Sequence, residues 1–385
     1  MVQADDRAIA FKNQVAVVGI GTTNHYGTYA DMGAYGMAQE AFKNALDDCG
    51  LTQDDIDGLI VGSGTGEPTA YDDMARYLGV HPRVAYPYSN GGRLFGPSVM
   101  LMASLVASGQ CDNVAFVYTN NARTARVKFG GQDEGASAIH PAYGFTSPGA
   151  NAAIEFRRYL HEFNQDREKL AAVAIGQRKS AALNPMAIFK DRPLTFDDYV
   201  EARYIAEPLR LNDYCIINDG AIVFILSRSD RAKDLKKPPV YIRAASQQGG
   251  WSIYHWQDGF EYEPYSRVAS RVYGAAGITP KDVDALFWYD AFAPFLLYYL
   301  EGFGFCGKGE ALDFIQGGRI ELGGELPVNT SGGHLSETYL QGRAIMVEAV
   351  RQIRGECGPR QVPNAEIVQF IGTAPNASSF ILSKE

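Results

Sequence analysis

The side chains best suited to proton chemistry lie within residues 282–342. The segments YDAF, TSGGH and ETYLQG place Tyr289 directly before Asp290 and put His334 ahead of Tyr339. A phenol can donate and accept a proton, but its ordinary pKa near 10 is about three units too high for an efficient base at neutral pH. A tyrosine base would need a neighbouring donor, for which His334 is a candidate, or a relay through water. Asp290 has the wrong charge to help directly.

Each of these residues also has an ordinary structural interpretation. Tyr289 closes the aromatic run FWY, which is typical of a strand in a protein core. Tyr339 is also consistent with a surface residue at the start of a helix, and His334 with a loop residue packed beside two glycines. The types of the residues alone do not choose between chemistry and packing.

Other chemistries lack the spacing that they require. The 5 cysteines include no C-x-x-C pair and the 6 histidines no H-x-x-x-H pair, so neither a zinc site nor a disulfide framework is indicated. G-x-S-x-G, the signature of many serine hydrolases, is absent. Gly19 and Gly21 follow a predicted strand, but Asn24 stands where a dinucleotide-binding turn has its third glycine. We therefore expect no metal and no resident cofactor.

Composition indicates a globular protein with a large core. The chain has 385 residues, of which 46% are hydrophobic and 21% charged, and its formal net charge is −9. No basic surface for nucleic acid is indicated. The N-terminus resembles no signal peptide, and no apolar run reaches the roughly 18 residues of a membrane helix. We expect a cytoplasmic protein that binds neither nucleic acid nor membrane.

Strands alternate with helices along the chain, which predicts an α/β fold. Gly50 is expected to cap the first helix. Predicted strands lie at 15–18, 56–61, 114–118, 221–226 and 240–243, and predicted helices at 34–49, 98–108, 151–163 and 167–182.

Two segments repeat each other. Residues 50–61 read GLTQDDIDGLIV and residues 277–288 read GITPKDVDALFW, each after an amphipathic helix and leading into an apolar strand. A repeat this long indicates a duplicated α/β half rather than a solenoid. We expect an N-terminal half at 1–235 and a C-terminal half at 236–385, joined by a charged linker at 228–239. A cap or loop domain is expected within the first half, at about 119–212.

A second group of aromatic residues follows the first strand of the C-terminal half. The segment WSIYHWQDGFEYEPY begins at Trp251 and includes Tyr254. These residues are candidates for the wall of a flat apolar binding site. Packing in the core or against a partner is the alternative, and it is slightly favoured.

The run G-G-x-L-P-x-N-T-S-G-G at residues 323–333 carries a resemblance to a known family. Together with the NP dipeptide at 184–185, the segment at 207–226 and the C-terminal IGTAPNASSFIL, it resembles the thiolase superfamily, in particular the enzymes related to sterol carrier protein x. The resemblance covers nearly the whole chain. It implies two duplicated halves in a five-layered α/β/α/β/α body with an inserted loop domain, acyl-CoA substrates and a homodimer.

The catalytic residues of the thiolase pattern are replaced. The position of the nucleophilic cysteine falls at about Gly92, and Ser89 is the nearest hydroxyl. Tyr289 stands in place of one active-site histidine and Tyr339 in place of another, and the second cysteine position falls at about Phe370. Two phenols at two catalytic positions resemble the steroid side-chain-cleaving aldolases, a thiolase-like group that works with a zinc-ribbon/OB-fold partner.

A retro-aldol reaction is consistent with these replacements. Cleaving a β-hydroxyacyl-CoA needs a base for the hydroxyl, an oxyanion hole for the enolate and an acid for the α-carbon, but no covalent acyl-enzyme. The resemblance implies a steroid thioester cleaved to a 17-ketosteroid and propionyl-CoA, with Tyr289 and Tyr339 as acid and base. Gly92 and Gly372 would supply backbone N–H groups. Another carbon–carbon lyase or synthase, or a scaffold that binds acyl-CoA or a partner without catalysis, stays open.

The resemblance also implies an assembly. Residues 98–118 carry more apolar side chains than one half needs, which suggests a dimer interface there. We expect a homodimer joined by two zinc-ribbon partner chains in a heterotetramer.

Overall fold

The computed structural model describes residues 9–88, 91–128, 147–249, 260, 262–373 and 376–385. The candidate residues Ser89, Trp251 and Tyr254 lie outside this part of the chain, so the expectation about an aromatic wall stays untested. Within it, no helix is long and apolar enough to cross a membrane.

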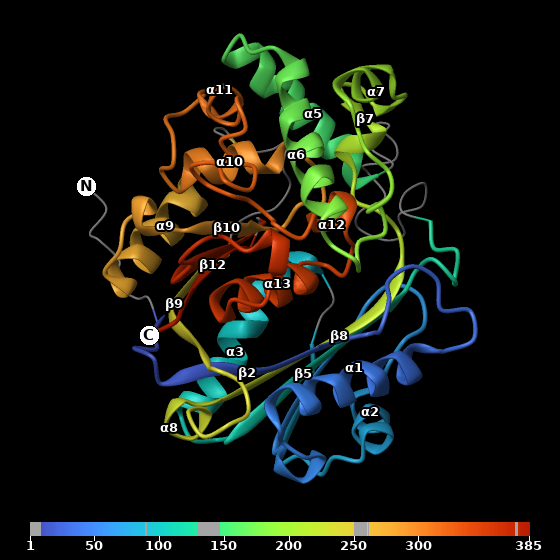
Figure 1. The fold of residues 1–385 in the computed structure, drawn as a ribbon, viewed down its shortest axis with the longest axis vertical. Helices are drawn as coiled ribbons and strands as arrows, with labels where there is room; N and C mark the ends of the chain where they lie inside the picture. Colours follow the sequence, from blue (N-terminus) through green and yellow to red (C-terminus); the bar gives the residue numbers. More distant parts are fainter. Residues whose placement is uncertain (1–8, 89–90, 129–146, 250–259, 261, 374–375) are drawn as a thin grey trace.

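Helices and strands alternate as expected (Figure 1). The strands are β1 (Ile9–Ala10), β2 (Val15–Thr22), β3 (Gly58–Ser63), β4 (Val84–Tyr88), β5 (Asn113–Asn121), β6 (Tyr204–Ala206), β7 (Leu209–Arg210), β8 (Asp219–Arg228), β9 (Val240–Gly249), β10 (Ala285–Trp288), β11 (Ile367–Gly372) and β12 (Asn376–Ser383). The main helices are α1 (Ala34–Cys49), α2 (Tyr71–Leu78), α3 (Phe95–Ala107), α5 (Pro148–Glu162), α6 (Ala171–Ala182), α7 (Phe196–Glu201), α9 (Tyr262–Ala276), α10 (Phe295–Gly302), α12 (Gly333–Ser336) and α13 (Arg343–Arg354).

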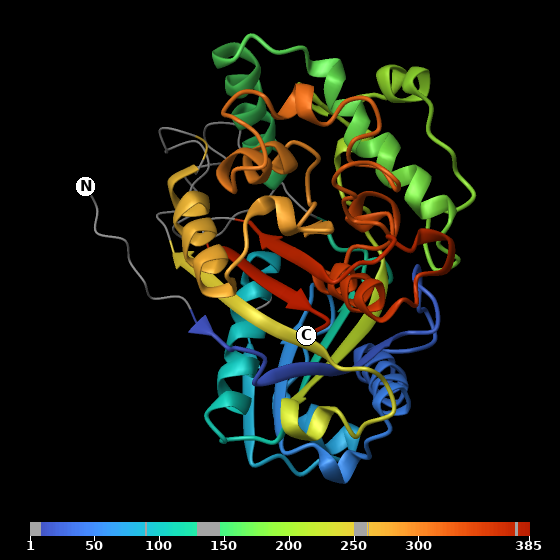
Figure 2. The ribbon, with the colours of Figure 1, turned by 60° about the vertical axis from the view of Figure 1, so that its left-hand side comes forward.

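One sheet joins the two halves of the chain. In the described residues its order is β10-β11-β12-β9-β2-β8-β5-β3-β4, with β1 paired to β9. The halves meet where β9 pairs with β2 through only two residue pairs, Ala16 with Tyr241 and Val17 with Val240. Figure 2 shows β9 in yellow between the red strands of the C-terminal half and the blue strand β2.

Helices form three layers around these strands. α1 and α2 pack on the outside of the N-terminal strands, and α9 packs on β9 and β12 with α10 against it. α3 and α13 contact strands of both halves and therefore lie between them. The result is the five-layered thiolase fold that the sequence predicts, with the large apolar core around the two central helices.

The elements around α3 correct one argument of the sequence analysis. β5 is paired with β3 on one side and β8 on the other, and nearly all of α3 is buried. The apolar side chains of residues 98–118 are thus used within the chain, because a central helix and an interior strand are covered on both faces. The outer strand of this half is β4.

The insertion is fixed against the C-terminal half through α6. Nε of Arg178 donates to Oγ of Ser336 at 2.9 Å, and Nδ2 of Asn184 donates to the carbonyl oxygen of Ser331 at 3.0 Å. A Cβ on Gly332 would lie 2.7 Å from the Cβ of Ala181, so this glycine permits α6 to approach. The inserted helices therefore support the short helix α12, which carries His334.

Candidate functional site

The two tyrosines singled out in the sequence meet in the fold. Oη of Tyr289 lies 2.9 Å from Oη of Tyr339, and either phenol can be the donor of this hydrogen bond. Tyr289 is 6% exposed, and Tyr339 is partly buried. Two phenols that share a hydrogen bond can pass a proton between them, so the pair can serve as one acid–base unit.

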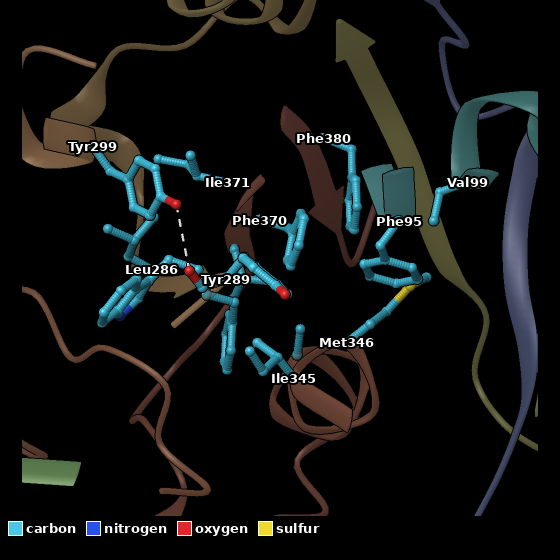
Figure 3. Close-up of a cluster of buried hydrophobic side chains, with 14 of the residues drawn as sticks. Phe95, Val99, Leu286, Tyr289, Tyr299, Ile345, Met346, Phe370, Ile371 and Phe380 are labelled. Carbon is cyan, nitrogen blue, oxygen red and sulfur yellow. Dashed lines mark hydrogen bonds between the residues drawn. The ribbon is translucent and has the colours of Figure 1, made fainter. Parts of the chain in front are cut away.

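Tyr289 follows directly after β10, where several bonds fix its backbone. Its N–H donates to the carbonyl oxygen of Ile371 on β11 at 3.0 Å. Asn329 holds the preceding residue from the other side, since Trp288 N–H donates to its Oδ1 at 2.9 Å and its Nδ2 donates to Trp288 O at 3.0 Å. The hydroxyl of Tyr299 donates to the carbonyl oxygen of Tyr289 at 3.4 Å (Figure 3). The asparagine of the N-T-S-G-G run thus positions the first phenol.

Tyr339 lies between α12 and α13. Its N–H donates to Oδ1 of Asn218 at 2.7 Å, and Nδ2 of Asn218 donates to Oγ1 of Thr338 at 2.7 Å. Burial raises the pKa of Tyr339 well above its ordinary value, and the neighbouring Tyr289 adds to the rise. Tyr339 in isolation is therefore an acid that keeps its proton, and a base only with help from a positive charge.

Gly92 lies against the ring of Tyr289. A Cβ on this glycine would come within 2.2 Å of Cε2, 2.4 Å of Cζ and 2.4 Å of Oη of Tyr289. The phenol hydroxyl therefore occupies the space into which a side chain at position 92 would point. Tyr289 can adopt this position only because residue 92 is a glycine.

His334 is a buried residue of α12 and packs edge-on against both phenols. Its ring centroid is 5.2 Å from that of Tyr289 and 5.1 Å from that of Tyr339. Its Nε2 accepts the N–H of Gly342 at 2.8 Å, which leaves the proton on Nδ1. Because Nε2 is occupied as an acceptor, His334 packs and orients the tyrosines in this structure rather than donating to them.

Asp290 fixes α12 beneath the tyrosines. Its Oδ2 accepts the backbone N–H of His334 at 2.8 Å, and its Oδ1 lies 2.9 Å from Nδ1 of His334. A Cβ on Gly333 would come within 2.2 Å of Oδ2 of Asp290, and the backbone at Gly333 has a positive φ of 57°. The second glycine pair of the motif thus permits the contact between the loop and this carboxylate.

Gly372 ends β11 beside the same group. Tyr289 bonds to Ile371, the residue before it, and Gly372 pairs with Ser378 on β12. Phe370, at the expected second cysteine position, stacks on Phe380 with ring centroids 4.8 Å apart (Figure 3). The structure therefore brings Gly92 and Gly372 to the tyrosines, and it places Phe370 in the core.

The cysteine thiols are in environments that disfavour the thiolate. Burial raises the pKa of Cys111 to about 11 and the pKa values of Cys215 and Cys306 to about 12. It raises the pKa values of Cys49 and Cys357 as well. Since the thiolate is the nucleophile, these raised pKa values disfavour covalent catalysis by a cysteine.

Arg343 is the residue of the site that the sequence analysis did not identify. It begins α13 and is 0% exposed, and its Cζ lies 4.1 Å from the ring centroid of Tyr118. Nothing in the local sequence indicates that an arginine at the start of a helix is buried. Its nearness to the tyrosines depends on α13 being a central helix.

Known proteins resemble this chain over nearly its full length. Residues 245–384 match the family described as thiolase C-terminal domain-like. The chain is 36% identical to the 17-hydroxy-3-oxo-4-pregnene-20-carboxyl-CoA lyase of Mycobacterium tuberculosis, covering 96% of this chain and 99% of that protein. It is 34% identical to the steroid side-chain-cleaving aldolase of Thermomonospora curvata, covering 96% of this chain and 98% of that protein.

The solved structure of an Ltp2-ChsH2(DUF35) aldolase superposes with a TM-score of 0.89 at 33% identity, covering 97% of this chain and 98% of that chain. The chain therefore belongs to the thiolase superfamily, in the thiolase-like group related to sterol carrier proteins that also contains the steroid side-chain-cleaving aldolases.

Proposed function

We propose that the protein is a lyase that cleaves a steroid β-hydroxyacyl-CoA, a 17-hydroxy-steroid side-chain thioester, into a 17-ketosteroid and propionyl-CoA. The observation that carries the proposal is the hydrogen bond of 2.9 Å between Oη of Tyr289 and Oη of Tyr339. The names of two relatives at 36% and 34% identity, a pregnene-carboxyl-CoA lyase and a steroid side-chain-cleaving aldolase, support the substrate class.

The tyrosine pair provides both proton transfers of a retro-aldol reaction. One phenol, as its phenolate, takes the proton of the β-hydroxyl while the carbon–carbon bond breaks and its electrons enter the thioester as an enolate. The pair then returns a proton to the α-carbon of the enolate, which regenerates the phenolate. No proton is gained or lost overall, so no external acid or base is needed.

The thioester oxygen requires donors while the enolate exists. Gly92 and Gly372 both lie next to Tyr289. A Cβ on Gly92 would overlap the Tyr289 ring, and Gly372 ends β11 directly after Ile371, whose carbonyl oxygen accepts the N–H of Tyr289. Backbone N–H groups at these two glycines are suited to stabilise a developing oxyanion, since glycine lets the backbone approach a ligand. The raised pKa values of the thiols favour this route over an acyl-enzyme.

The proposed assembly contains a second copy of the chain and a zinc-ribbon/OB-fold partner. The solved aldolase structure that names a DUF35 chain beside Ltp2 supports the partner. For the homodimer, β4 is an outer strand with no further strand paired to it among the described residues, and Tyr86 on it is 43% exposed. Light scattering at micromolar concentration should give at least twice the monomer mass, and a monomer would contradict the dimer.

The experiment that tests the function is product analysis by mass spectrometry. The protein, with its partner chain, is incubated with a steroid β-hydroxyacyl-CoA and no free CoA. We expect a ring ketone and propionyl-CoA in equal amounts, with no acyl adduct on any cysteine in the intact mass. Cleavage that requires added CoA would indicate a thiolase-type reaction and contradict the proposal.

The main alternative is a scaffold that binds acyl-CoA without cleaving it. A scaffold predicts that binding is unchanged and no product forms in the same incubation. Another acyl-CoA lyase predicts cleavage of non-steroid β-hydroxyacyl-CoA thioesters at higher kcat/KM than steroid ones.

A further inference from the structure

Arg343 carries a buried positive charge, and no carboxylate of the described residues forms an ion pair with it. Its Nη1 donates to the carbonyl oxygen of Gln341 at 2.8 Å and to Oε1 of the same residue at 3.2 Å. Its Nε and Nη2 are buried without a hydrogen-bond partner, and no ion pair forms with it among the described residues. Burying a charge without a counter-charge is costly, so the position requires a physical explanation.

The start of α13 increases the positive potential at this point. Arg343 is the first residue of that helix, where unpaired N–H groups and the helix dipole already present a partial positive charge. Helix N-termini usually carry acidic residues for that reason. Two sources of positive potential therefore coincide at one buried position.

The guanidinium lies over aromatic rings, with its Cζ 4.1 Å from the ring centroid of Tyr118, 5.4 Å from that of Phe95 and 5.6 Å from that of Phe116. The titratable groups that act on its charge are phenols. A phenolate at Tyr118, Tyr289, Tyr339 or Tyr88 would raise the pKa of Arg343, against the lowering caused by burial. An interaction between two charges is mutual, so the guanidinium stabilises a phenolate at each of these positions. An arginine keeps its charge even when it is buried.

We propose that Arg343 is a positioning residue for the Tyr289–Tyr339 pair, whose guanidinium stabilises the phenolate that the pair must hold to take the substrate proton. The inference rests on the proposed lyase function. It explains why an arginine without a carboxylate occurs in the central layer, since a permanent carboxylate would neutralise the charge that the phenolate needs.

Other titratable groups face the pair and must stay constant in any test. They come from the loop after β10, from α12, from the segment before β8, and from β5 and β4: Asp290, His334, Cys215, Tyr118 and Tyr88. None of these five carries a permanent positive charge, as Arg343 does. Removing the charge of Arg343 should therefore raise the pKa values of the phenols.

The variants Arg343→Met and Arg343→Lys test the proposal. Met keeps much of the apolar stem without the charge, and it removes the cost of burying a charge that has no counter-charge. We expect Arg343→Met to retain its Tm and to lose ~10²-fold in kcat, the lower range for a positioned acid or base, with KM changed less than about threefold. Arg343→Lys should recover most of the loss.

Arg360 provides the matched control for removing a buried arginine. Its Nε and Nη2 contact the two carboxylate oxygens of Glu348 at 2.9 and 3.0 Å. Arg360→Met leaves the buried carboxylate of Glu348 without its counter-charge and should lower Tm. A parallel loss of Tm and kcat in Arg343→Met, with no recovery in Arg343→Lys, would make Arg343 structural and overturn the proposal.

A second readout does not depend on turnover. NMR of the protein labelled at the tyrosine ζ carbon reports ionisation of each phenol, assigned with Tyr289→Phe and Tyr339→Phe. We expect phenolate in the pair to appear at least about one pH unit higher in Arg343→Met than in the unaltered protein. If this shift is found but no steroid thioester is cleaved, the proposed function fails and the role of Arg343 stands. An unshifted titration overturns the role of Arg343 whether or not the protein is a lyase.

Discussion

The two repeated segments fold in the same way but end differently. In each, a threonine and an aspartate form a reciprocal cap: Thr52 N–H donates to Asp55 Oδ2 at 2.8 Å, and Thr279 N–H to Asp282 Oδ2 at 2.7 Å. In each, a second aspartate accepts two N–H groups at the start of the neighbouring strand. These are Asp57 for residues 112 and 113, and Asp284 for residues 366 and 367.

The difference lies where the strands end. In the N-terminal half Gly62 pairs with Tyr118 on the neighbouring strand. In the C-terminal half the same register, continued by the bond from Tyr289 to Ile371, sets Tyr289 beside Gly372. The phenol and the glycine have exchanged strands. In the proposed mechanism, the phenol of the C-terminal half is the one that works with Tyr339.

The largest expected effect comes from removing the hydroxyls of the pair. Tyr289→Phe and Tyr339→Phe should each lower kcat by ~10²–10⁴-fold, because each removes a positioned acid or base and changes the packing little. Tyr118→Phe removes the phenol that faces a glycine across the corresponding strands of the N-terminal half, and it should cost less than about tenfold by comparison. Steady-state kinetics on the folded, partner-bound variants gives all three values. Equal losses at Tyr118 and Tyr289 would break the comparison between the halves.

The next effect is a pH dependence of stability from the C-terminal half. Burial raises the pKa of Glu337 to about 8, with Glu348 contributing. A carboxyl whose pKa is raised in the folded state binds protons more tightly there, so its stabilising contribution is present below its unfolded pKa near 4.5 and is lost as pH rises to about 8. Relative to Glu337→Gln, the protein should lose about 3 kcal/mol of unfolding free energy between about pH 5 and pH 8.

Denaturant titrations of both proteins across that range provide the measurement for Glu337. A constant difference between the two would mean that Glu337 stays ionised in the folded protein. Its bonds from Ser331 and Asn184 would then outweigh the burial.

A smaller effect, on both stability and turnover, is expected for a substitution at Gly92. The Cβ of Gly92→Ala would overlap the ring of Tyr289, so the phenol must move, at a cost of about 1–3 kcal/mol in stability and a loss of turnover. Gly274→Ala is the matched control, since the position is exposed within α9 and its Cβ meets nothing within 4 Å. That variant should gain up to about 1 kcal/mol in stability and keep its activity. Thermal unfolding and kinetics that show the same behaviour for both variants would remove the steric argument.

The smallest effects test the symmetry itself. Thr52→Ala and Thr279→Ala each remove one side of a cap, and each should cost about 1 kcal/mol of unfolding free energy. Both should leave kcat unchanged, because the caps are far along the strands from the tyrosines. Chemical denaturation measures the two costs, and a difference of more than about 1 kcal/mol would show that the halves are not energetically equivalent here.

The sequence predicted most of the elements because each has a local cause. Helix α1 ends where Gly50 adopts a left-handed φ of 78°, as the expected cap. Periodicity predicted α3 three residues late, at 98 rather than Phe95, because the first turn contains Gly96 and Pro97 and shows no amphipathic pattern. The apolar excess of residues 98–118 was misinterpreted as a surface for dimerisation because burial between two layers is not visible in one segment.

The site was partly predictable for a different reason. Tyr289 and Tyr339 lie in segments with strong sequence motifs, and their meeting follows from the fold that those motifs imply. Arg343 was missed because its burial results from the packing of α13 between both halves, to which no local pattern refers. The orientation of His334 was also unpredictable, because it depends on the N–H of Gly342 eight residues away.

The most direct test of the account is a double-mutant cycle on the tyrosine pair. In the proposed mechanism Tyr289 and Tyr339, joined by a hydrogen bond of 2.9 Å, act as one unit on one transition state. The rate of cleavage of a steroid β-hydroxyacyl-CoA is measured for the unaltered protein, both single Phe variants and the double variant, each shown to be folded and partner-bound. We expect the double variant to be slower than the slower single variant by less than about tenfold, because residues that act together are not additive. A double loss equal to the product of the single losses, or a single variant that keeps more than about half of its turnover, would contradict the claim.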